Sequence, residues 1–175
     1  MSLNHLKPTP PDTPGQVAVF LADYANPTHA SALVSLLDAY AKDPMGGGEG
    51  LSDYAKANLV ASLAARSQAF SVLAVVDDKP VGLVNCLEGF STFACKPLVN
   101  VHDVAVLADY RGRGIGDRML RFCEALSRDR GACKMTLEVL QSNVGAVRVY
   151  QRFGFASYQL GTTTGQAHFM QKWLK

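Results

Sequence analysis

Long apolar runs are missing from this chain, and so is a strong excess of charge of one sign. No apolar stretch approaches the roughly 20 residues that cross a bilayer, and residues 1–14 carry prolines where a signal peptide has its apolar centre. The 17 basic and 15 acidic residues give a formal net charge of only +2, which argues against a nucleic-acid footprint. We therefore predict a cytoplasmic protein that binds neither nucleic acid nor a membrane.

Clustered cysteines are lacking as well. Cys86, Cys95, Cys123 and Cys133 form no Cys-x-x-Cys pair and have no group of histidines beside them. This spacing matches no common zinc motif, so we predict reduced thiols and no metal site. The apolar residues around each cysteine favour small buried side chains over a reactive nucleophile, which is the alternative.

The composition is that of one folded domain. The chain has 175 residues, of which 48% are hydrophobic and 18% are charged. This length allows a substantial core but is short for two domains. We predict an irregular leader over residues 1–14, where prolines are frequent, and a single domain over residues 15–175.

Apolar periodicity predicts an α/β chain of the α+β type. Spacings of three and four indicate helices, and runs of β-branched residues between turn residues indicate strands. We expect strands near 16–21, 70–76, 81–90, 99–107 and 134–140, a closing hairpin of 156–160 with 167–173, and helices near 28–42, 52–66, 115–130 and 144–152. The expected fold is a mixed, mostly antiparallel sheet of six to seven strands, flanked by about four helices.

The most informative segment passes from an apolar strand through a glycine-rich turn into a helix. It reads Arg111, Gly112, Arg113, Gly114, Ile115, Gly116. Glycines leave the backbone amides exposed, and the start of a helix with two arginines beside it favours an anion. The segment therefore predicts a phosphate or pyrophosphate site, and a turn that only reverses the chain is the alternative.

The glycine spacing distinguishes this turn from other phosphate-binding loops. Gly-x-Gly-x-Gly differs from the Gly-x-Gly-x-x-Gly of dinucleotide folds, and no run of alternating βα units surrounds it. The second glycine-rich segment, 45–50, lacks the Lys-Ser/Thr of a P-loop. A nicotinamide enzyme is therefore disfavoured.

At these residues the chain resembles the GNAT superfamily of N-acetyltransferases. The family signature Gln/Arg-x-x-Gly-x-Gly/Ala is matched by Arg111, Gly114 and Gly116. A second motif over 139–155 is similar to the family's strand–Asn–helix–Tyr–Gly-Phe element. The resemblance covers residues 72–155 and implies acetyl-coenzyme A as the cosubstrate.

The resemblance also implies where the coenzyme binds. It assigns the pantetheine arm to the backbones of Val104 and Val106, and the pyrophosphate to the turn that begins at Arg111. From the second motif it adds Asn143, Ala146 and Tyr150. Without the family, Asn143 is also a suitable N-cap, and Tyr150 at helical spacing is also a typical core residue.

Acetyl transfer requires the acceptor amine to lose a proton before it attacks. His102 is one candidate base, because strand alternation puts it on the face of Val104 and Val106, and imidazole titrates near neutral pH. A structural pair of His102 with its neighbouring aspartate is the alternative, and Glu88 is the rival base. By resemblance, Tyr150 is the general acid to the coenzyme sulfur, and the N–H of Val106 stabilises the oxyanion.

The segment 90–93 followed by His102 and Asp103 looks like the diamine and polyamine acetyltransferase branch. That branch has Glu-Asp at this pair, so only Asp103 matches. We predict transfer of an acetyl group to the primary amine of a small molecule by direct attack in a ternary complex. A non-catalytic acyl-coenzyme A sensor and a protein N-terminal or lysine acetyltransferase are the alternatives. The terminal strand 168–173 offers an edge for pairing in a homodimer.

Overall fold

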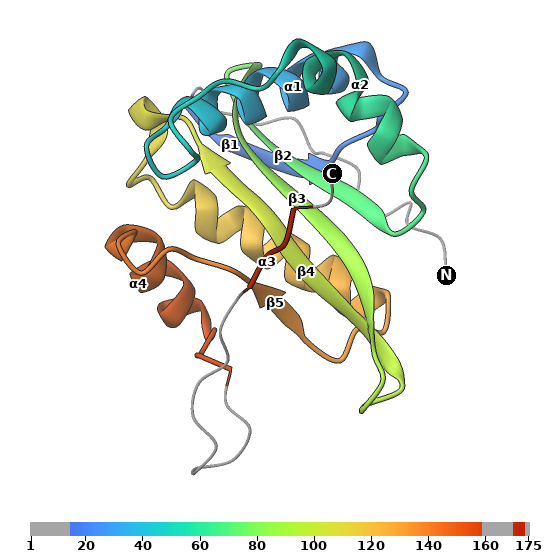
Figure 1. Cartoon of the computed structure of the whole chain (residues 1–175). Helices are drawn as coiled ribbons and strands as arrows, with labels where there is room; N and C mark the ends of the chain where they lie inside the picture. The colour runs from blue at the N-terminus through green and yellow to red at the C-terminus, as the bar shows by residue number, and fades with distance from the viewer. Residues whose placement is uncertain (1–14, 159–169, 174–175) are drawn as a thin grey trace. The chain divides into compact units, whose positions relative to one another are not determined.

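The computed structural model describes residues 15–158 and 170–173 (Figure 1). The predicted leader, residues 1–14, lies outside the described residues. The chain divides into two compact units, residues 1–137 and residues 138–175.

The first unit contains a five-stranded sheet in the order β1-β2-β3-β4-β5. Its first four strands pair antiparallel, and the fifth pairs parallel to the fourth. The predicted mixed, mostly antiparallel sheet is therefore confirmed. The strands are β1 (Val17–Leu21), β2 (Ala69–Val76), β3 (Lys79–Ser91), β4 (Lys96–Val106) and β5 (Met135–Leu137), and the helices of this unit are α1 (Pro27–Lys42), α2 (Asp53–Ala64) and α3 (Ile115–Asp129).

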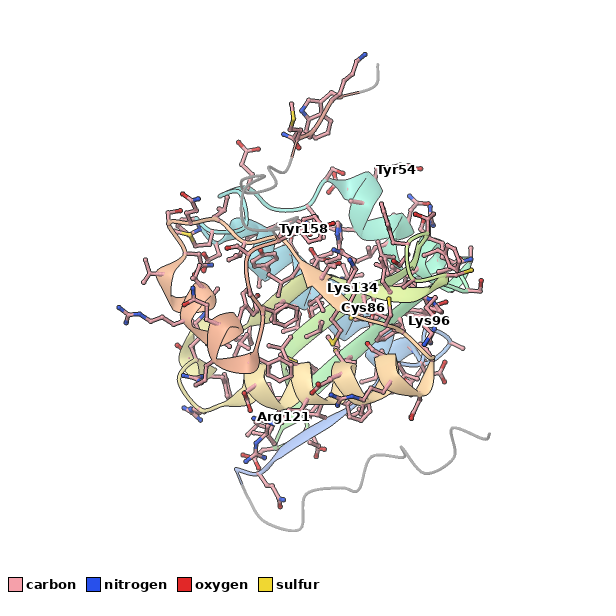
Figure 2. The ribbon with its side chains drawn as sticks, turned by 90° about the horizontal axis from the view of Figure 1, so that it is seen from below. Tyr54, Cys86, Lys96, Arg121, Lys134 and Tyr158 are labelled. Carbon is pink, nitrogen blue, oxygen red and sulfur yellow. The ribbon has the colours of Figure 1, made fainter. Side chains whose placement is uncertain are left out.

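The sheet is apolar on both faces, because its alternating residues pack against helices on each side. On one face, here called the α1 face, Leu73 and Leu83 belong to a buried cluster with Leu33 and Leu36 of α1. The opposite α3 face is closely packed, since a Cβ at Gly82 would lie 2.9 Å from the Met119 side chain. Figure 2 shows α1 and α2 on one side of the sheet and α3 on the other.

Local sequence sets the ends of these elements. The Asn26 side chain accepts the N–H groups of Thr28 and His29 at the start of α1, and the Ser52 hydroxyl accepts that of Ala55 at the start of α2. Between β2 and β3, Asp77 and Asp78 have φ values of 47° and 61°. Two successive positive φ angles suit a two-residue hairpin turn, as the Asp-Asp-Lys sequence indicates.

The second unit, as far as it is described, contains helix α4 (Val144–Phe153). The Asn143 carboxamide oxygen accepts the N–H of Ala146 at 3.1 Å, so the N-cap interpretation of Asn143 is confirmed. Gly154 ends the helix with a φ of 106°. With α4, the described residues contain the four helices that the periodicity predicts.

The prediction of six to seven strands is wrong, since the described residues form five. The extra strands come from the closing hairpin, whose residues 159–169 lie outside the described residues. The described ends, 156–158 and 170–173, belong to no strand. Met170 and Trp173 are 87% and 83% exposed, so the apolar alternation there buries nothing. The described part of the expected dimer edge 168–173 is likewise not a strand.

The cysteines are all free thiols, but they differ in burial. Cys86 and Cys123 are buried as predicted, whereas Cys95 and Cys133 are exposed. The prediction is wrong for both: Cys95 lies in the turn between β3 and β4, with a φ of 51°, and Cys133 lies in the loop between α3 and β5. A hydrogen bond with Cys86 and burial raise the pKa of the Cys123 thiol, which makes it a poor nucleophile.

The part of the chain that the structure describes contains neither a membrane-spanning helix nor a group of metal-binding residues. No helix there is long and apolar enough to span a membrane. No group of three or more His, Cys, Asp or Glu residues gathers there to hold a metal ion.

Candidate coenzyme and acceptor site

The glycine-rich turn connects β4 to α3 and leaves open space above it. After a short 3-10 helix, η2 (Ala108–Tyr110), Gly112 and Gly114 have φ values of 77° and 74°, and Gly114 is the N-cap of α3. A Cβ at Gly112, Gly114 or Gly116 would meet no atom within 4 Å. No atom of the described residues therefore fills the positions that side chains would occupy in this turn, and the first N–H groups of α3, which lack helical partners, remain candidates for binding an anion.

Packing against the sheet fixes the position of helix α3 and of its first amides. Its apolar side is buried against the sheet, and Ile115, Met119 and Leu120 are at most 1% exposed. The helix has 15 residues, long enough for its backbone dipoles to add up at the N-terminus. The candidate anion site thus lies on a helix that is packed into the core of the first unit.

The two arginines of the turn bind protein groups. Arg111 donates from Nε to the carbonyl oxygen of Val106 at 3.0 Å and from Nη2 to Asp43 Oδ2 at 2.8 Å. Arg113 donates from Nη2 to the carbonyl oxygen of Asp109 at 3.0 Å, and its guanidinium lies 4.9 Å from the centre of the Tyr110 ring. The Arg111 guanidinium, helped by the Met45 N–H, lowers the pKa of the Asp43 carboxyl.

Strand β4 contains a bulge at His102. Cys86 pairs with Val101 and Asn85 pairs with Asp103, so His102 is an extra residue in the ladder. The sequence carries no signal for this bulge, because an extra residue is defined only by the pairing with β3. Strict alternation does not run through a bulge, so it no longer supports placing His102 on the face of Val104.

Beyond the bulge, one edge of β4 is available for hydrogen bonding. The Leu107 N–H donates to the carbonyl oxygen of Val81, so Leu107 faces β3. Because backbone groups alternate along a strand, Val104 and Val106 direct theirs away from β3. On that side β5 pairs with β4 only from Val99 to Val101. In the described part of the chain no strand pairs with this stretch, here called the open edge of β4.

The two candidate bases lie in different surroundings. His102 is exposed, and the described residues contain no hydrogen bond between it and Asp103, which instead accepts from Asn85. Glu88 is on the α3 face, where its Oε2 lies 3.3 Å from Arg130 Nη1. Glu88 is paired with Val99, five residues before Val104, and this separation corresponds to roughly 16 Å along a strand.

A chain of polar side chains crosses the α1 face and ends at Asp103. The Tyr24 hydroxyl lies 2.9 Å from Ser71 Oγ, Ser71 Oγ donates to Asn85 Oδ1 at 2.6 Å, and Asn85 Nδ2 donates to Asp103 Oδ2 at 2.9 Å. Ser71 and Asn85 are 0% and 4% exposed. This group is not among the predicted site residues, although a serine and an asparagine inside apolar strands are a visible signal in the sequence.

Two tyrosines near this row of polar side chains, Tyr24 and Tyr40, have a raised pKa. Burial, followed by the charges of Asp103 and Asp43, raises the pKa of Tyr40 on α1. Burial also raises the pKa of Tyr24, against the hydrogen bond with Ser71, which lowers it. Asp103 therefore contributes negative charge on the α1 face next to the open edge of β4, whereas the charge of Asp43 is paired with Arg111.

A separate groove of about 580 Å³ lies between α1 and α2. Its charged lining residues, Asp38 and Lys56, pair with each other at 3.2 Å. Since that charge is already neutralised, the groove has less to offer a charged acceptor than the region around Asp103.

The predicted coenzyme residues fall into two groups. Val104, Val106 and the glycine turn lie together in the first unit. Asn143, Ala146 and Tyr150 lie together on or at the start of α4 in the second unit. The Tyr150 ring meets Phe155 edge-on, with 6.0 Å between ring centres.

The fold and the turn define a class of protein. Residues 33–155 match the model of the acetyltransferase (GNAT) family, and because this is more than half of the chain, the chain belongs to that family. The resemblance predicted from the glycine turn is thereby confirmed. Proteins of this family are acyltransferases that use acetyl-CoA as cosubstrate.

Curated relatives match parts of the chain. An uncharacterized N-acetyltransferase of Methanocaldococcus jannaschii is 35% identical over 81 residues, 46% of this chain and 36% of the relative. The streptothricin acetyltransferase of Streptomyces lavendulae is 35% identical over 79 residues, 43% of this chain and 42% of the relative. The matches thus span less than half of the length of either relative.

A solved structure has a similar fold. An aminoglycoside N-acetyltransferase in complex with CoA has a TM-score of 0.69 and 17% sequence identity, and the match covers 93% of this chain and 98% of that chain. At this identity the similarity concerns the fold alone.

Proposed function

We propose that this chain is an N-acetyltransferase, which transfers the acetyl group of acetyl-CoA to the primary amine of a small molecule by direct attack in a ternary complex. The observation that carries the proposal is the glycine turn, which opens the N-terminus of α3 beside the open edge of β4. An anion site next to backbone groups that, in the described residues, pair with no neighbouring strand suits a long ligand with a phosphate at one end and an amide-containing arm.

In this proposal, both backbone groups and side chains bind the coenzyme. The amides from Gly112 to Gly116 hold the pyrophosphate, with Arg111 and Arg113 as the neighbouring cations. The backbones of Val104 and Val106 bind the pantetheine arm at the open edge, and the Val106 N–H is the oxyanion donor. The family resemblance adds Asn143, Ala146 and Tyr150 of the second unit as further coenzyme residues; Asn143 is the N-cap of α4, and the other two lie on the helix.

Proton transfer requires an acid and a base. Tyr150 is the general acid to the departing thiolate. His102 is the base we favour, acting directly or through water, because it is exposed and lies two residues from Val104. Glu88 is the less suitable base, since Arg130 binds its carboxylate.

The acceptor is a cationic amine in this proposal. Asp103 places a carboxylate on the α1 face next to the open edge, and its charge is one cause, after burial, of the raised pKa of Tyr40. The streptothricin and aminoglycoside acetyltransferases are named for acceptors that are small molecules. Diamines and polyamines are the first acceptors to test, because Asp103 is shared with that branch. The proposed setting is the cytoplasm, where acetyl-CoA is available.

Release of free thiol from acetyl-CoA, measured over a panel of amines, tests the proposal. The panel contains diamines, polyamines, aminoglycosides, amino acids and a peptide with a free N-terminus. Turnover with a small amine above the hydrolysis background supports the proposal. Coenzyme binding without thiol release for any amine would instead support an acyl-CoA sensor, and turnover of the peptide alone would support a protein acetyltransferase.

A further inference from the structure

The polar chain from Tyr24 to Asp103 is not needed to pack the sheet. The cross-strand pair Ser71–Asn85 lies next to the pair Leu73–Leu83 on the same face of the sheet, and Leu73 and Leu83 are 1% and 0% exposed. A buried carboxamide is tolerated only when it is hydrogen-bonded, and apolar residues of similar volume pack such a face at least as well. A fully satisfied polar group in this position therefore points to a role beyond stability.

The hydrogen bonds from Tyr24 to Asp103 all donate in the same direction, toward Asp103. Ser71 has a single hydroxyl proton, which it donates to Asn85 Oδ1, so the Tyr24 hydroxyl must donate to Ser71 Oγ. Asn85 then donates from Nδ2 to Asp103 Oδ2. The opposite orientation of the Asn85 carboxamide would turn its oxygen toward a carboxylate. Each bond polarises the next one, and the chain ends on the negative charge of Asp103.

This row of hydrogen bonds positions the Asp103 carboxylate and does not relay a proton. A carboxamide neither gains nor loses a proton readily, so Asn85 blocks proton transfer between Ser71 and Asp103. What Asn85 can do is fix the position of Oδ2. The described residues contain no hydrogen bond to Asp103 Oδ1, so this oxygen is available to a ligand.

Asp103 lies on the side of β4 that the coenzyme leaves free. It directly precedes Val104, whose backbone faces the open edge, and its partner Asn85 is on the α1 face. Helix α3, whose N-terminus binds the pyrophosphate in the proposed function, is on the opposite face. An acceptor that approaches from the α1 face therefore meets the Asp103 carboxylate close to the reacting end of the coenzyme.

We infer that Asn85, supported by Ser71 and Tyr24, is a positioning residue that holds the Asp103 carboxylate for the ammonium group of a cationic acceptor. This inference rests on the proposed function and deepens it, because it names the group that selects cationic amines. Asp103 touches the acceptor, and Asn85 acts only through Asp103.

A double-mutant cycle tests the inference. Asn85→Leu, Asp103→Asn and the double variant are compared with the unmodified chain, with the best amine of the panel and with acetyl-CoA. Each single variant raises the KM for the amine about tenfold, as expected for a lost charged contact, and leaves the KM for acetyl-CoA within about twofold of its original value. In the double variant the KM for the amine is no higher than in Asp103→Asn alone.

Two further variants distinguish an effect on amine binding from a loss of stability. Val72→Ala removes buried side-chain volume beside Ser71 on the opposite face, so it lowers Tm and leaves the KM for the amine unchanged. Ser71→Ala keeps Asn85 and removes its donor, and it takes the place of Asn85→Leu in the cycle when that variant does not fold.

The outcomes separate the inference from the proposed function. Additive effects of the Asn85 and Asp103 substitutions, or an unchanged KM for the amine in Asn85→Leu, would overturn the positioning role while thiol release by the unmodified chain keeps the proposed function. An unmodified chain that acetylates no amine overturns both. Full non-additivity with an unchanged KM for acetyl-CoA supports the inference.

Discussion

Arg111 ties the glycine turn to the residue that follows α1, since its Nη2 lies 2.8 Å from Asp43 Oδ2. The same guanidinium donates from Nε to the carbonyl oxygen of Val106 on the open edge. The ion pair is largely at the surface, with the Arg111 side chain 55% exposed. Exposed pairs of this kind contribute about 0.2 to 1 kcal/mol, whereas the hydrogen bond to Val106 fixes Arg111 directly to the open edge.

The first prediction concerns substitution of Arg111. Glutamine has an N–H donor on Cδ, at the position of the arginine Nε, so Arg111→Gln keeps the bond to Val106 and loses the ion pair with Asp43. We expect the Kd for CoA, measured by calorimetry, to rise about threefold in Arg111→Gln, which loses one cation near the pyrophosphate, and about tenfold in Arg111→Ala, which also loses the hydrogen bond to Val106. Equal losses in both variants would show that the positive charge itself binds the phosphates.

The second prediction compares two glycines of the same turn. Gly114 has a φ of 74°, which strains any other residue, whereas Gly116 lies inside α3 and has open space around it. Gly114→Ala should lower the free energy of unfolding by about 1 kcal/mol or more and weaken CoA binding. Gly116→Ala, which the family signature permits, should raise helix stability by up to about 1 kcal/mol. Urea unfolding and calorimetry measure both, and equal behaviour of the two variants would contradict the turn geometry.

The third prediction concerns Asp38, which joins α1 to the start of α2. Asp38 accepts from Lys42 at 2.7 Å, from Lys56 at 3.2 Å and from the Leu51 N–H at 2.8 Å. These contacts, with Lys42 the largest, lower the pKa of Asp38 to about 2. A lowered pKa stabilises the fold above the unfolded value of ~3.9, and this contribution disappears as the pH falls toward the folded value.

Thermal unfolding at several pH values tests this linkage. Asp38→Asn should lower Tm at pH 7, and the difference from the unmodified chain should shrink between about pH 4 and pH 2. Asp78→Asn is the matched control, because Asp78 occupies the β2–β3 turn with a positive φ that asparagine tolerates. A difference for Asp38→Asn that is independent of pH would mean that shape, and not charge, matters at this position.

The sequence predicts the fold well where a pattern is local. Helices α1 and α3 begin and end within a residue or two of their expected bounds, because apolar spacing and capping residues define them. Strand β5 is shorter than expected, Met135–Leu137 against 134–140, because its pairing with β4 stops at Val101. Strand length depends on a partner, which apolar spacing does not reveal.

In the candidate site, too, features with a local sequence pattern are predictable, and features that depend on a partner strand are not. The glycine turn is a local signal, so its position at the start of α3 was predictable. The bulge at His102 and the polar chain to Asp103 both depend on the register between β3 and β4. A one-residue change in that register would move Asn85 away from Asp103, so no single strand could predict their contact.

The last prediction concerns Tyr150 as the general acid. Tyr150→Phe removes only the hydroxyl and keeps the ring that meets Phe155 edge-on. The departing thiolate then lacks its proton donor, so kcat should fall by about 10²-fold, whereas the Kd for CoA changes little because the hydroxyl acts on the leaving group. Phe155→Leu is the control that disturbs the ring contact and keeps the hydroxyl, and it should retain most of kcat. Steady-state kinetics with the best amine, together with calorimetry, distinguish these effects, and an unchanged kcat in Tyr150→Phe would remove Tyr150 from the mechanism.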